Sequence, residues 1–473
     1  MTSTSDTPTQ AVAEHTESRN TNRSTTPHSP EFLDFIGSNW AERDDALPAE
    51  RAQAPFARAR RDELSRTFPG QRLVIEAGSL KQRSNDTDYP FRAHSAFSHL
   101  TGWGSDSEPD SVLVFEPADD GHEVTLYFRE RAGRDSAEFF ANATIGEFWI
   151  GPRPSLAQVA ADLGVATANL PEFVATSADV TLLNEDLLRV CSEMRLVKDA
   201  FEIAEMRSAV AATARGFDEI IEDLPRAVST GRGERVVEGA FYTRARIEGN
   251  AVGYDTIAAS GSNACILHWT RNDGAVRPGD LILVDAGVEM DSLYTVDITR
   301  TLPISGTFDA VQRRVYEAVL EAADAAFAIV RPGIRFREVH EAAMTVIAKY
   351  TAAWGMIPVT AEEALQTESQ LHRRFMVHGT CHHLGIDVHD CAQARREMYY
   401  DGILEEGMIF TIEPGLYIQP DDLNAPEEFR GIGVRIEDDI LVTADGAENL
   451  SAGIPRSIAE VEAWMAAPGH RSA

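Results

Sequence analysis

Hydrophobic residues recur at helical spacing in several stretches of the chain. Between residues 155 and 163, Leu156, Val159, Ala160 and Leu163 fall on one stripe, the pattern of an amphipathic helix. Asp199 stands three residues before Glu202, a capping-box pattern that precedes a longer apolar series with the same period. This pattern predicts that a long helix begins here. We also expect helices over residues 51–68, 310–330 and 336–354.

Short apolar runs bounded by Gly, Pro or Asp predict strands between these helices. The expected strands cover residues 73–75, 111–115, 124–128, 281–284, 294–302, 408–418 and 431–442. The mixture indicates an α/β (α+β) protein. A chain of 473 residues exceeds one ordinary hydrophobic core, so we expect two domains, over residues 31–193 and 194–473.

Composition narrows the classes of partner. Residues 1–30 are rich in Ser, Thr, Asn and Pro, which predicts a disordered tail, and we expect neither a secretory signal nor a membrane span. The net charge of -32 repels phosphate backbones and anionic lipid, so we expect no nucleic-acid and no membrane partner. The four cysteines lack metal-type CxxC spacing, which favours reduced thiols in a cytoplasmic protein.

Two aspartates mark the first candidate site. Asp285 ends the apolar run 281–284, where an ionised carboxylate costs several kcal/mol unless it is paired or bound to metal. Asp297 lies in the next expected strand, and an antiparallel hairpin would bring the two carboxylates together. Close carboxylates repel each other, and a cation relieves the repulsion. Taken alone, Asp285 also fits a strand-end residue that reaches solvent at a turn.

Histidines form the second signal. His378, His382, His383 and His389 occur within twelve residues, beside turn-forming glycines. Histidine is the commonest metal ligand and carries protons near neutral pH. The cluster by itself does not say which member binds a metal.

Further carboxylates follow. Glu413 ends another apolar run, and Arg435 and Glu437 stand two apart, so that on one strand both would project from the same face. The pair also fits solvent-facing charges on an edge strand. Together with Asp285 and Asp297, this mostly oxygen donor set suits Mn²⁺, Mg²⁺ or Co²⁺ better than a thiolate zinc site. Four carboxylates call for about two divalent cations, which can share a hydroxide.

In order and spacing, these motifs resemble the aminopeptidase P / prolidase family of pita-bread metallopeptidases. The matching stretches are residues 260–268, 285–287, 297–301, 378–389, 411–417 and 431–439, which span almost the whole second domain. The resemblance implies an N-terminal creatinase-like α/β domain followed by a C-terminal pita-bread catalytic domain. Residues 83–87, 89–92 and 97–102 resemble the N-terminal domain of the aminopeptidase P branch.

The resemblance also implies roles for individual residues. Its metal ligands fall on Asp285, Asp297, His382, Glu413 and Glu437. The remaining site residues that it implies are His268, His378, His389 and Arg435. One departure is visible: twelve positions separate Asp285 from Asp297, where the family usually has eleven. We expect the extra residue in the hairpin turn.

The activity implied is that of a metalloaminopeptidase, which releases the N-terminal residue from peptides with proline at the second position. A hydroxide shared by two divalent ions, with Mn²⁺ favoured, would attack, and Glu413 would act as general base. His268 and His389 would donate hydrogen bonds to the oxyanion or the second residue, while His378 would position substrate. The alternatives are a prolidase, creatinase-like C–N hydrolysis, and a non-catalytic pita-bread binding protein. The family implies a homo-oligomer, dimer or tetramer.

Overall fold

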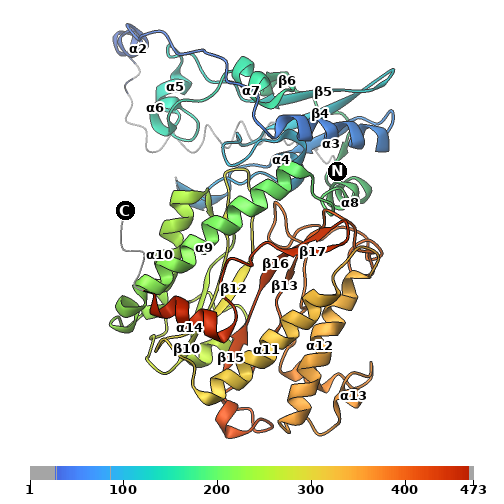
Figure 1. Ribbon diagram of the computed structural model, residues 1–473. Helices are drawn as coiled ribbons and strands as arrows, with labels where there is room; N and C mark the ends of the chain where they lie inside the picture. Colours follow the sequence, from blue (N-terminus) through green and yellow to red (C-terminus); the bar gives the residue numbers. More distant parts are fainter. Residues whose placement is uncertain (1–26, 28, 86, 468–473) are drawn as a thin grey trace, which may run out of the picture. The chain divides into compact units, whose positions relative to one another are not determined.

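The computed structural model describes residue 27 and residues 29–85 and 87–467 (Figure 1). These residues form two compact units, of which the first ends at Asn184 and the second begins at Glu185. The domain boundary expected between residues 193 and 194 stays a prediction. Of the expected tail, residues 1–26 and 28 lie outside the described residues, and Pro30 begins helix α2.

The first unit is built on a five-stranded sheet with the order β6-β5-β4-β1-β7. Strands β1, β4 and β5 pair antiparallel, while β6 and β7 add to the two edges in parallel. Helices α3 and α4 pack against this sheet, and every residue of α4 is buried. The elements are α2 (Pro30–Gly37), α3 (Ala54–Thr67), β1 (Leu73–Glu76), β2 (Gln82–Ser84), β3 (Thr87–Asp88), α4 (Ser95–Thr101), β4 (Val112–Ala118), β5 (Gly121–Phe128), α5 (Ala137–Ala141), α6 (Glu147–Ile150), α7 (Leu156–Leu163), β6 (Ala166–Asn169), η1 (Leu170–Glu172) and β7 (Val180–Thr181).

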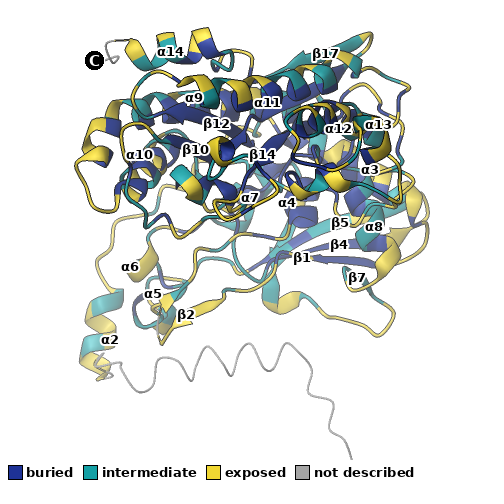
Figure 2. Ribbon diagram, turned by 90° about the horizontal axis from the view of Figure 1, so that it is seen from below, coloured by how far each residue is buried: buried dark blue, intermediate teal, exposed yellow. Residues whose placement is uncertain are grey.

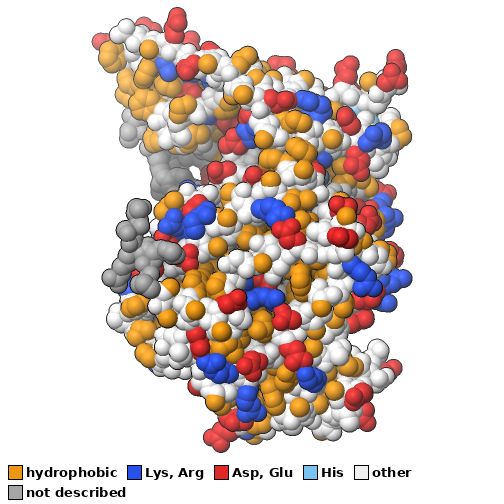
Figure 3. Space-filling model, in the orientation of Figure 1, with side chains coloured by type: hydrophobic (Ala, Val, Ile, Leu, Met, Phe, Trp, Pro, Cys, Tyr) orange, Lys and Arg blue, Asp and Glu red, His pale blue; other side chains and the backbone are white. Residues whose placement is uncertain are grey.

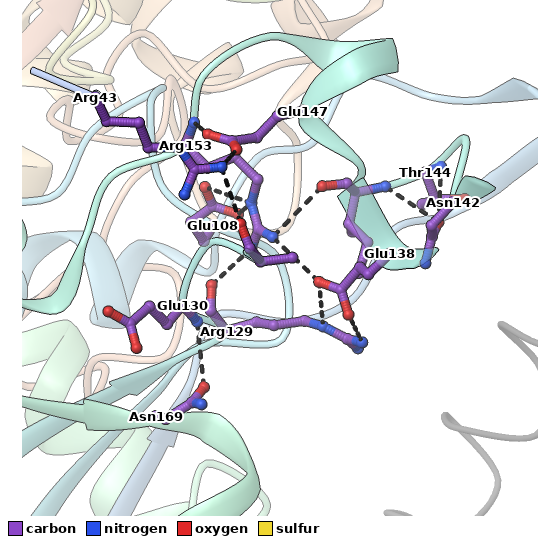
Figure 4. A network of polar contacts seen from close by, with 12 residues as sticks. Arg43, Glu108, Arg129, Glu130, Glu138, Asn142, Thr144, Glu147, Arg153 and Asn169 are labelled. Carbon is purple, nitrogen blue, oxygen red and sulfur yellow. Dashed lines mark hydrogen bonds and ion pairs between the residues drawn. The ribbon is translucent and has the colours of Figure 1, made fainter. Parts of the chain in front are cut away.

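A buried arginine links the loops at one end of this sheet. The Arg153 guanidinium donates to the Glu108 carboxylate and to the carbonyl of Arg129, at 3.0 and 2.7 Å from Nη2 (Figure 4). Glu138 lies beside it, 3.8 Å from Nη1. Arg153 is 5% exposed, so these partners offset the cost of removing its charge from water.

The second unit combines helices with several small sheets. Helices α9 and α10 pack against each other, as do α11 and α12. The elements are α8 (Glu185–Glu193), α9 (Ala200–Val228), α10 (Gly233–Glu248), β8 (Ala251–Val252), β9 (Ile257–Ser260), η2 (Gly261–Cys265), β10 (Leu281–Ala286), β11 (Val288–Glu289), β12 (Ile298–Pro303), α11 (Ala310–Ile329), α12 (Phe336–Ala353), α13 (Ala361–Ala364), η3 (Leu371–Arg374), β13 (Ile409–Ile412), β14 (Gly415–Tyr417), η4 (Glu427–Phe429), β15 (Gly433–Arg435), β16 (Asp438–Thr443), β17 (Gly446–Asn449) and α14 (Ile458–Ala466).

Two three-stranded sheets lie at the centre of this unit. Their orders are β12-β10-β9 and β13-β16-β17, and β14-β15 and β11-β8 form separate two-stranded sheets. Strands β10 and β12 are buried along their whole length, whereas the outer faces of the helices are exposed (Figure 2). Strand β12 also buries the polar residues Thr299, Arg300 and Thr301.

Several expected elements are confirmed. Helices α3, α7, α11 and α12 lie where the helical period predicted them, and Asp199 caps α9 in a capping box with Glu202. Strands β10 and β12 form the expected antiparallel hairpin. Helix α10 was not anticipated. It begins at Gly233 and contains Gly239, and glycine lowers helix propensity.

The two long strands expected near the C-terminus are wrong as single strands. Residues 408–418 divide into β13 and β14, and residues 431–442 divide into β15 and β16. Strand β14 pairs with β15, while β13 pairs with β16. Between them the Glu437 amide leaves the ladder and donates to the Thr299 carbonyl of β12, at 3.1 Å. The chain therefore changes sheets at Glu413 and at Glu437.

The expected strand over residues 294–302 also begins later, at Ile298. Residues 290–293 form a turn closed by a hydrogen bond from the Leu293 amide to the Met290 carbonyl. Leu293 has a φ of 72°, in the left-handed region that side chains rarely adopt. The turn therefore strains a residue between the two aspartates.

The surface mixes both signs of charge. Acidic and basic side chains are interspersed on the face shown in Figure 3, and exposed pairs such as Arg207–Glu448 join different elements. Among the described residues, none of the helices is both long and apolar enough to cross a bilayer.

Candidate metal centre

The hairpin of β10 and β12 positions the two aspartates. Asp285 faces Thr299 across the ladder, and Asp297 directly precedes the first residue of β12. Gly287 lies where a side chain would block this approach, because a Cβ there would stand 1.6 Å from the Val296 carbonyl oxygen. Absence of a side chain at residue 287 therefore lets the strand return close enough to bring Asp297 beside Asp285.

The loops before β13 and β14 supply the imidazole and another carboxylate. The Thr411 amide donates to the His382 carbonyl at 2.9 Å, and the Glu413 amide donates to the Thr380 carbonyl at 2.8 Å. These bonds hold the histidine segment along β13. The His382 Nε2 atom consequently lies 3.4 Å from Asp297 Oδ2 and 3.7 Å from Glu413 Oε1.

Three overlapping groups of residues could each hold a metal ion, because within each group the ligand atoms lie within 4.8 Å of one another. The groups are Asp297, His382 and His389; His382, Glu413 and Glu437; and Asp285, Asp297 and Glu437. The structure thus brings together all five residues expected as metal ligands. It also adds His389, whose ring stacks on His382 with centroids 3.9 Å apart.

Arg435 enters the same centre. Its Nη2 donates to Asp285, and its Nε donates to Thr299 Oγ1 at 3.0 Å. Thr299 in turn donates to Glu437 Oε2 at 2.6 Å. Arg435 therefore orients one carboxylate directly and another through a threonine hydroxyl.

His378 lies at the edge of this network. Its Nδ1 faces the Gly379 carbonyl at 2.7 Å, and a carbonyl only accepts, so Nδ1 carries the proton. The Nε2 atom then accepts from the Tyr417 hydroxyl at 2.7 Å, and Arg435 Nη1 donates to that hydroxyl at 3.1 Å. Burial, and then the charge of Arg435, lower the pKa of His378 to about 3. His378 is neutral in this arrangement.

The crowded carboxylates change each other's titration. Burial, followed by the charge of Asp297, raises the pKa of Asp285 to about 7. Burial also raises the pKa of Glu413 to about 8 and that of Glu437 well above its ordinary value. For Asp297, burial alone would raise the pKa, but the hydrogen bond and charge of His382 together with the hydrogen bonds of Tyr254 and Asp285 lower it. If all four carboxylates were ionised together, their negative charge would exceed the single positive charge of Arg435.

Comparison with known proteins places the chain in a family. The family model described as "Metallopeptidase family M24" matches residues 204–444, and "Aminopeptidase P, N-terminal domain" matches residues 57–181. Two relatives from Streptomyces coelicolor, Xaa-Pro aminopeptidase 1 and Xaa-Pro aminopeptidase 2, are 49% and 51% identical. Both alignments cover 93% of this chain, with 92% and 96% of the relatives. The chain belongs to metallopeptidase family M24.

Solved structures agree with this family assignment. Aminopeptidase P from E. coli, in a low-pH form, superposes with a TM-score of 0.76 at 31% identity, covering 88% of this chain and 99% of that chain. A zinc-substituted form of the E. coli enzyme in complex with product has the same TM-score and identity and covers 89% of this chain. The second unit has the pita-bread fold of the M24 family, and the first corresponds to the aminopeptidase P N-terminal domain.

The donor set of this M24 protein fits divalent cations. Asp285 and Glu413 would retain protons near neutral pH because their pKa values are raised to about 7 and about 8. Cations supply the positive charge that lets such carboxylates ionise together. The donors are oxygens and imidazole nitrogen without thiolate, a set that suits hard divalent metals.

Sequence reasoning did not assign a role to Tyr254, nor to Thr299 and Tyr417, which bond the predicted site residues. The Tyr254 hydroxyl contacts Asp285 Oδ1 at 2.7 Å and also contacts Asp297. Its single proton can be donated to only one of the two at a time. Tyr254 lies in the segment between β8 and β9, and no periodic pattern or charge there distinguishes it from a core tyrosine.

Proposed function

We propose that this M24 protein is an Xaa-Pro aminopeptidase, which releases the N-terminal residue from peptides with proline at the second position. The observation that carries the proposal is the convergence of four carboxylates and an imidazole in one buried centre. The relatives named Xaa-Pro aminopeptidase, 49% and 51% identical over 93% of the chain, support the substrate class.

Five residues would hold two divalent cations: Asp285, Asp297, His382, Glu413 and Glu437. Their oxygen-rich donor set supports Mn²⁺ as the favoured ion. When bound, the cations would lower the pKa of a water molecule and polarise the scissile carbonyl.

Glu413 is proposed as the general base. Its carboxylate is partly buried beside the other ligands, and desolvation raises its pKa to about 8, which favours accepting a proton near neutral pH. The leaving nitrogen of proline is a tertiary amide nitrogen without N–H, so it must be protonated as the bond breaks. Glu413 would return the proton that it accepted.

The histidines would bind and orient the substrate. Burial lowers the pKa of His389 to about 4, so its imidazole is neutral and donates a single N–H. His389 and the exposed His268 are proposed to donate hydrogen bonds to the developing oxyanion or to the second residue. Both ring nitrogens of His378 have partners within the protein, so His378 would act by orienting Tyr417 rather than by a free N–H.

The proposal is tested by incubating the protein with Mn²⁺ and either an Xaa-Pro-Xaa tripeptide or an Xaa-Pro dipeptide, followed by mass spectrometry. We expect tripeptide cleavage that chelator abolishes and that Glu413→Gln reduces about a thousandfold while the fold is kept. Glu406→Gln, an exposed position on the turn before β13, is the matched control.

Cleavage of the dipeptide alone would identify a prolidase instead. Absence of cleavage with metal bound would reject the substrate class, and absence of both cleavage and metal would favour a non-catalytic binding protein. Glu413→Gln activity within threefold of wild type would reject the general-base role.

A further inference from the structure

Glu234 is a buried carboxylate that lies outside the metal centre. It is in the first turn of α10 and is 0% exposed. Its Oε1 accepts from the Ser260 amide and from Asn263 Nδ2, each at 2.8 Å. Its Oε2 accepts from Trp269 Nε1 at 2.8 Å and from the Gly274 amide at 2.6 Å. One side chain therefore receives four hydrogen bonds.

These donors come from both ends of a single loop. Ser260 ends β9 and Asn263 lies in η2, whereas Trp269 and Gly274 lie on the far side of the loop. His268, proposed above to contact substrate, directly precedes Trp269. The loop that presents His268 is thus closed on itself through Glu234.

A second side chain closes the same loop on β9. Asn272 is fully buried, with a φ of 47°. Its Oδ1 accepts from the Ala258 amide at 3.0 Å, and its Nδ2 donates to the Thr256 carbonyl at 2.8 Å. Asn272 thus holds residues 256 and 258, whereas Glu234 supplies the hydrogen-bond partner of Trp269, whose ring also packs against the apolar cluster that includes Ile257 and Leu283.

The charge of Glu234 is part of this arrangement. A buried carboxylate is costly unless hydrogen bonds satisfy it, and four N–H donors together with the N-terminal end of α10 do so. All four partners donate, so an acceptor-only group is required at this place. The packing is also tight, since a Cβ on Gly274 would stand 2.6 Å from Glu234 Oε1.

We propose that Glu234 is a positioning residue for His268, which fixes the loop so that the imidazole reaches the substrate. The inference rests on the proposed function, in which His268 donates a hydrogen bond during Xaa-Pro cleavage. Glu234 touches neither the metal ligands nor the substrate in this role. It acts through Trp269 and the backbone of the loop.

A double-mutant cycle tests this role. Glu234→Gln keeps the shape of the side chain but replaces one carboxylate oxygen by an NH₂ group, which then faces the two N–H donors that this oxygen had accepted from. We expect kcat/KM for the tripeptide to fall about tenfold while the metal content is unchanged. In a His268→Ala background, the same substitution should change kcat/KM by less than about twofold, because the residue that it positions is already absent.

Two further variants guard against a simple loss of stability. Glu202→Gln alters another buried carboxylate of the same unit, which accepts from the Tyr294 hydroxyl at 2.7 Å, and its effect should be equal in both backgrounds. Trp269→Phe removes one of the four donors and keeps a large ring. Trp269→Phe should lower kcat/KM less than Glu234→Gln does, and its effect should again be smaller in the His268→Ala background.

Hydrogen exchange supplies a readout that does not depend on substrate. The Ser260 and Gly274 amides donate directly to Glu234, so in Glu234→Gln both should exchange about tenfold faster or more, and in Glu202→Gln they should not. If the wild type were inactive but the variants showed this exchange pattern, the proposed function would be rejected, while the role of Glu234 in holding the loop would stand. An active wild type in which Glu234→Gln lowers kcat/KM equally in both backgrounds, or not at all, would overturn the positioning role.

Discussion

His340 of α12 lies between Arg373 and Thr380, and each brings a hydrogen-bond donor to its ring. Arg373 Nη1 stands 3.1 Å from Nε2, while Nδ1 lies 3.2 Å from the Thr380 amide nitrogen and 2.8 Å from Thr380 Oγ1. Because a guanidinium and an amide N–H only donate, these contacts disfavour an imidazolium with protons on both nitrogens. Burial, and then the charge of Arg373, lower the pKa of His340 to about 4. The folded protein therefore holds this imidazole neutral.

This charge state predicts a loss of stability in acid. The unfolded chain has an ordinary histidine pKa of about 6.5, so below that value it binds a proton that the folded state refuses. The stabilisation is complete above pH 6.5 and is lost as the pH falls towards about 4. Between pH 8 and pH 4.5, the free energy of unfolding measured in urea should fall by about 1–2 kcal/mol less for His340→Gln than for wild type. This figure is already reduced for the partial exposure of the ring. Equal losses in the two proteins would contradict the assignment.

At the scale of elements, the hairpin of β10 and β12 determines where two carboxylates meet. The register pairs Ala286 with Ile298, so Gly287 and Asp297 follow at the end of the ladder. The Val296 carbonyl occupies the space that a side chain at residue 287 would need. A backbone contact of this kind cannot be relieved by rotating a side chain.

Gly287→Ala is therefore expected to open the end of the hairpin and lower the free energy of unfolding by about 3 kcal/mol or more. Bound metal should fall with it, because Asp297 moves away from Asp285. Gly446→Ala is the matched control in a strand of the same unit, where the nearest atom to the new Cβ is Thr443 Oγ1 at 4.0 Å. Urea unfolding and metal analysis of both variants check this, and equal changes would show that the Val296 contact is not the cause.

For the whole molecule, the two compact units differ in their relation to metal. The proposed ligands all belong to the second unit, which also contains the larger hydrophobic cluster. Asp285 and the three carboxylates beside it would repel each other if all four were ionised, and bound cations relieve that repulsion. Metal binding should therefore stabilise the second unit selectively.

Removing metal from the wild-type protein should lower the melting temperature of the second unit by several degrees. Saturating metal at about a thousand times its dissociation constant contributes about 4 kcal/mol. Chelator should lower the melting temperature of Asp285→Ala far less, since this variant lacks one metal ligand. Differential scanning calorimetry with and without chelator makes the measurement, and identical shifts in both proteins would argue against Asp285 as a ligand.

Local signals explain why much of this molecule could be predicted from its sequence. The helical period and the Asp199 capping box depend on residues within a few turns, so the beginning of α9 and both bounds of α11 and α12 were found close to their observed positions. Carboxylates at the ends of apolar runs are costly wherever they occur, which pointed to Asp285 and Glu413. The resemblance of ordered motifs then singled out His382 among four neighbouring histidines.

Contacts between distant residues could not be predicted in this way. Tyr254 meets Asp285 and Asp297 from a segment with no distinguishing pattern, and Glu234 collects donors from both ends of a loop. The change of sheets at Glu437 depends on an acceptor in β12, the Thr299 carbonyl. Sequence alone therefore determined several helices, the net negative charge and the candidate carboxylates, because these follow from local period and composition, while the family resemblance added the choice of His382. Only the tertiary structure decided which side chains complete and orient the centre, because those contacts join positions that no sequence period relates.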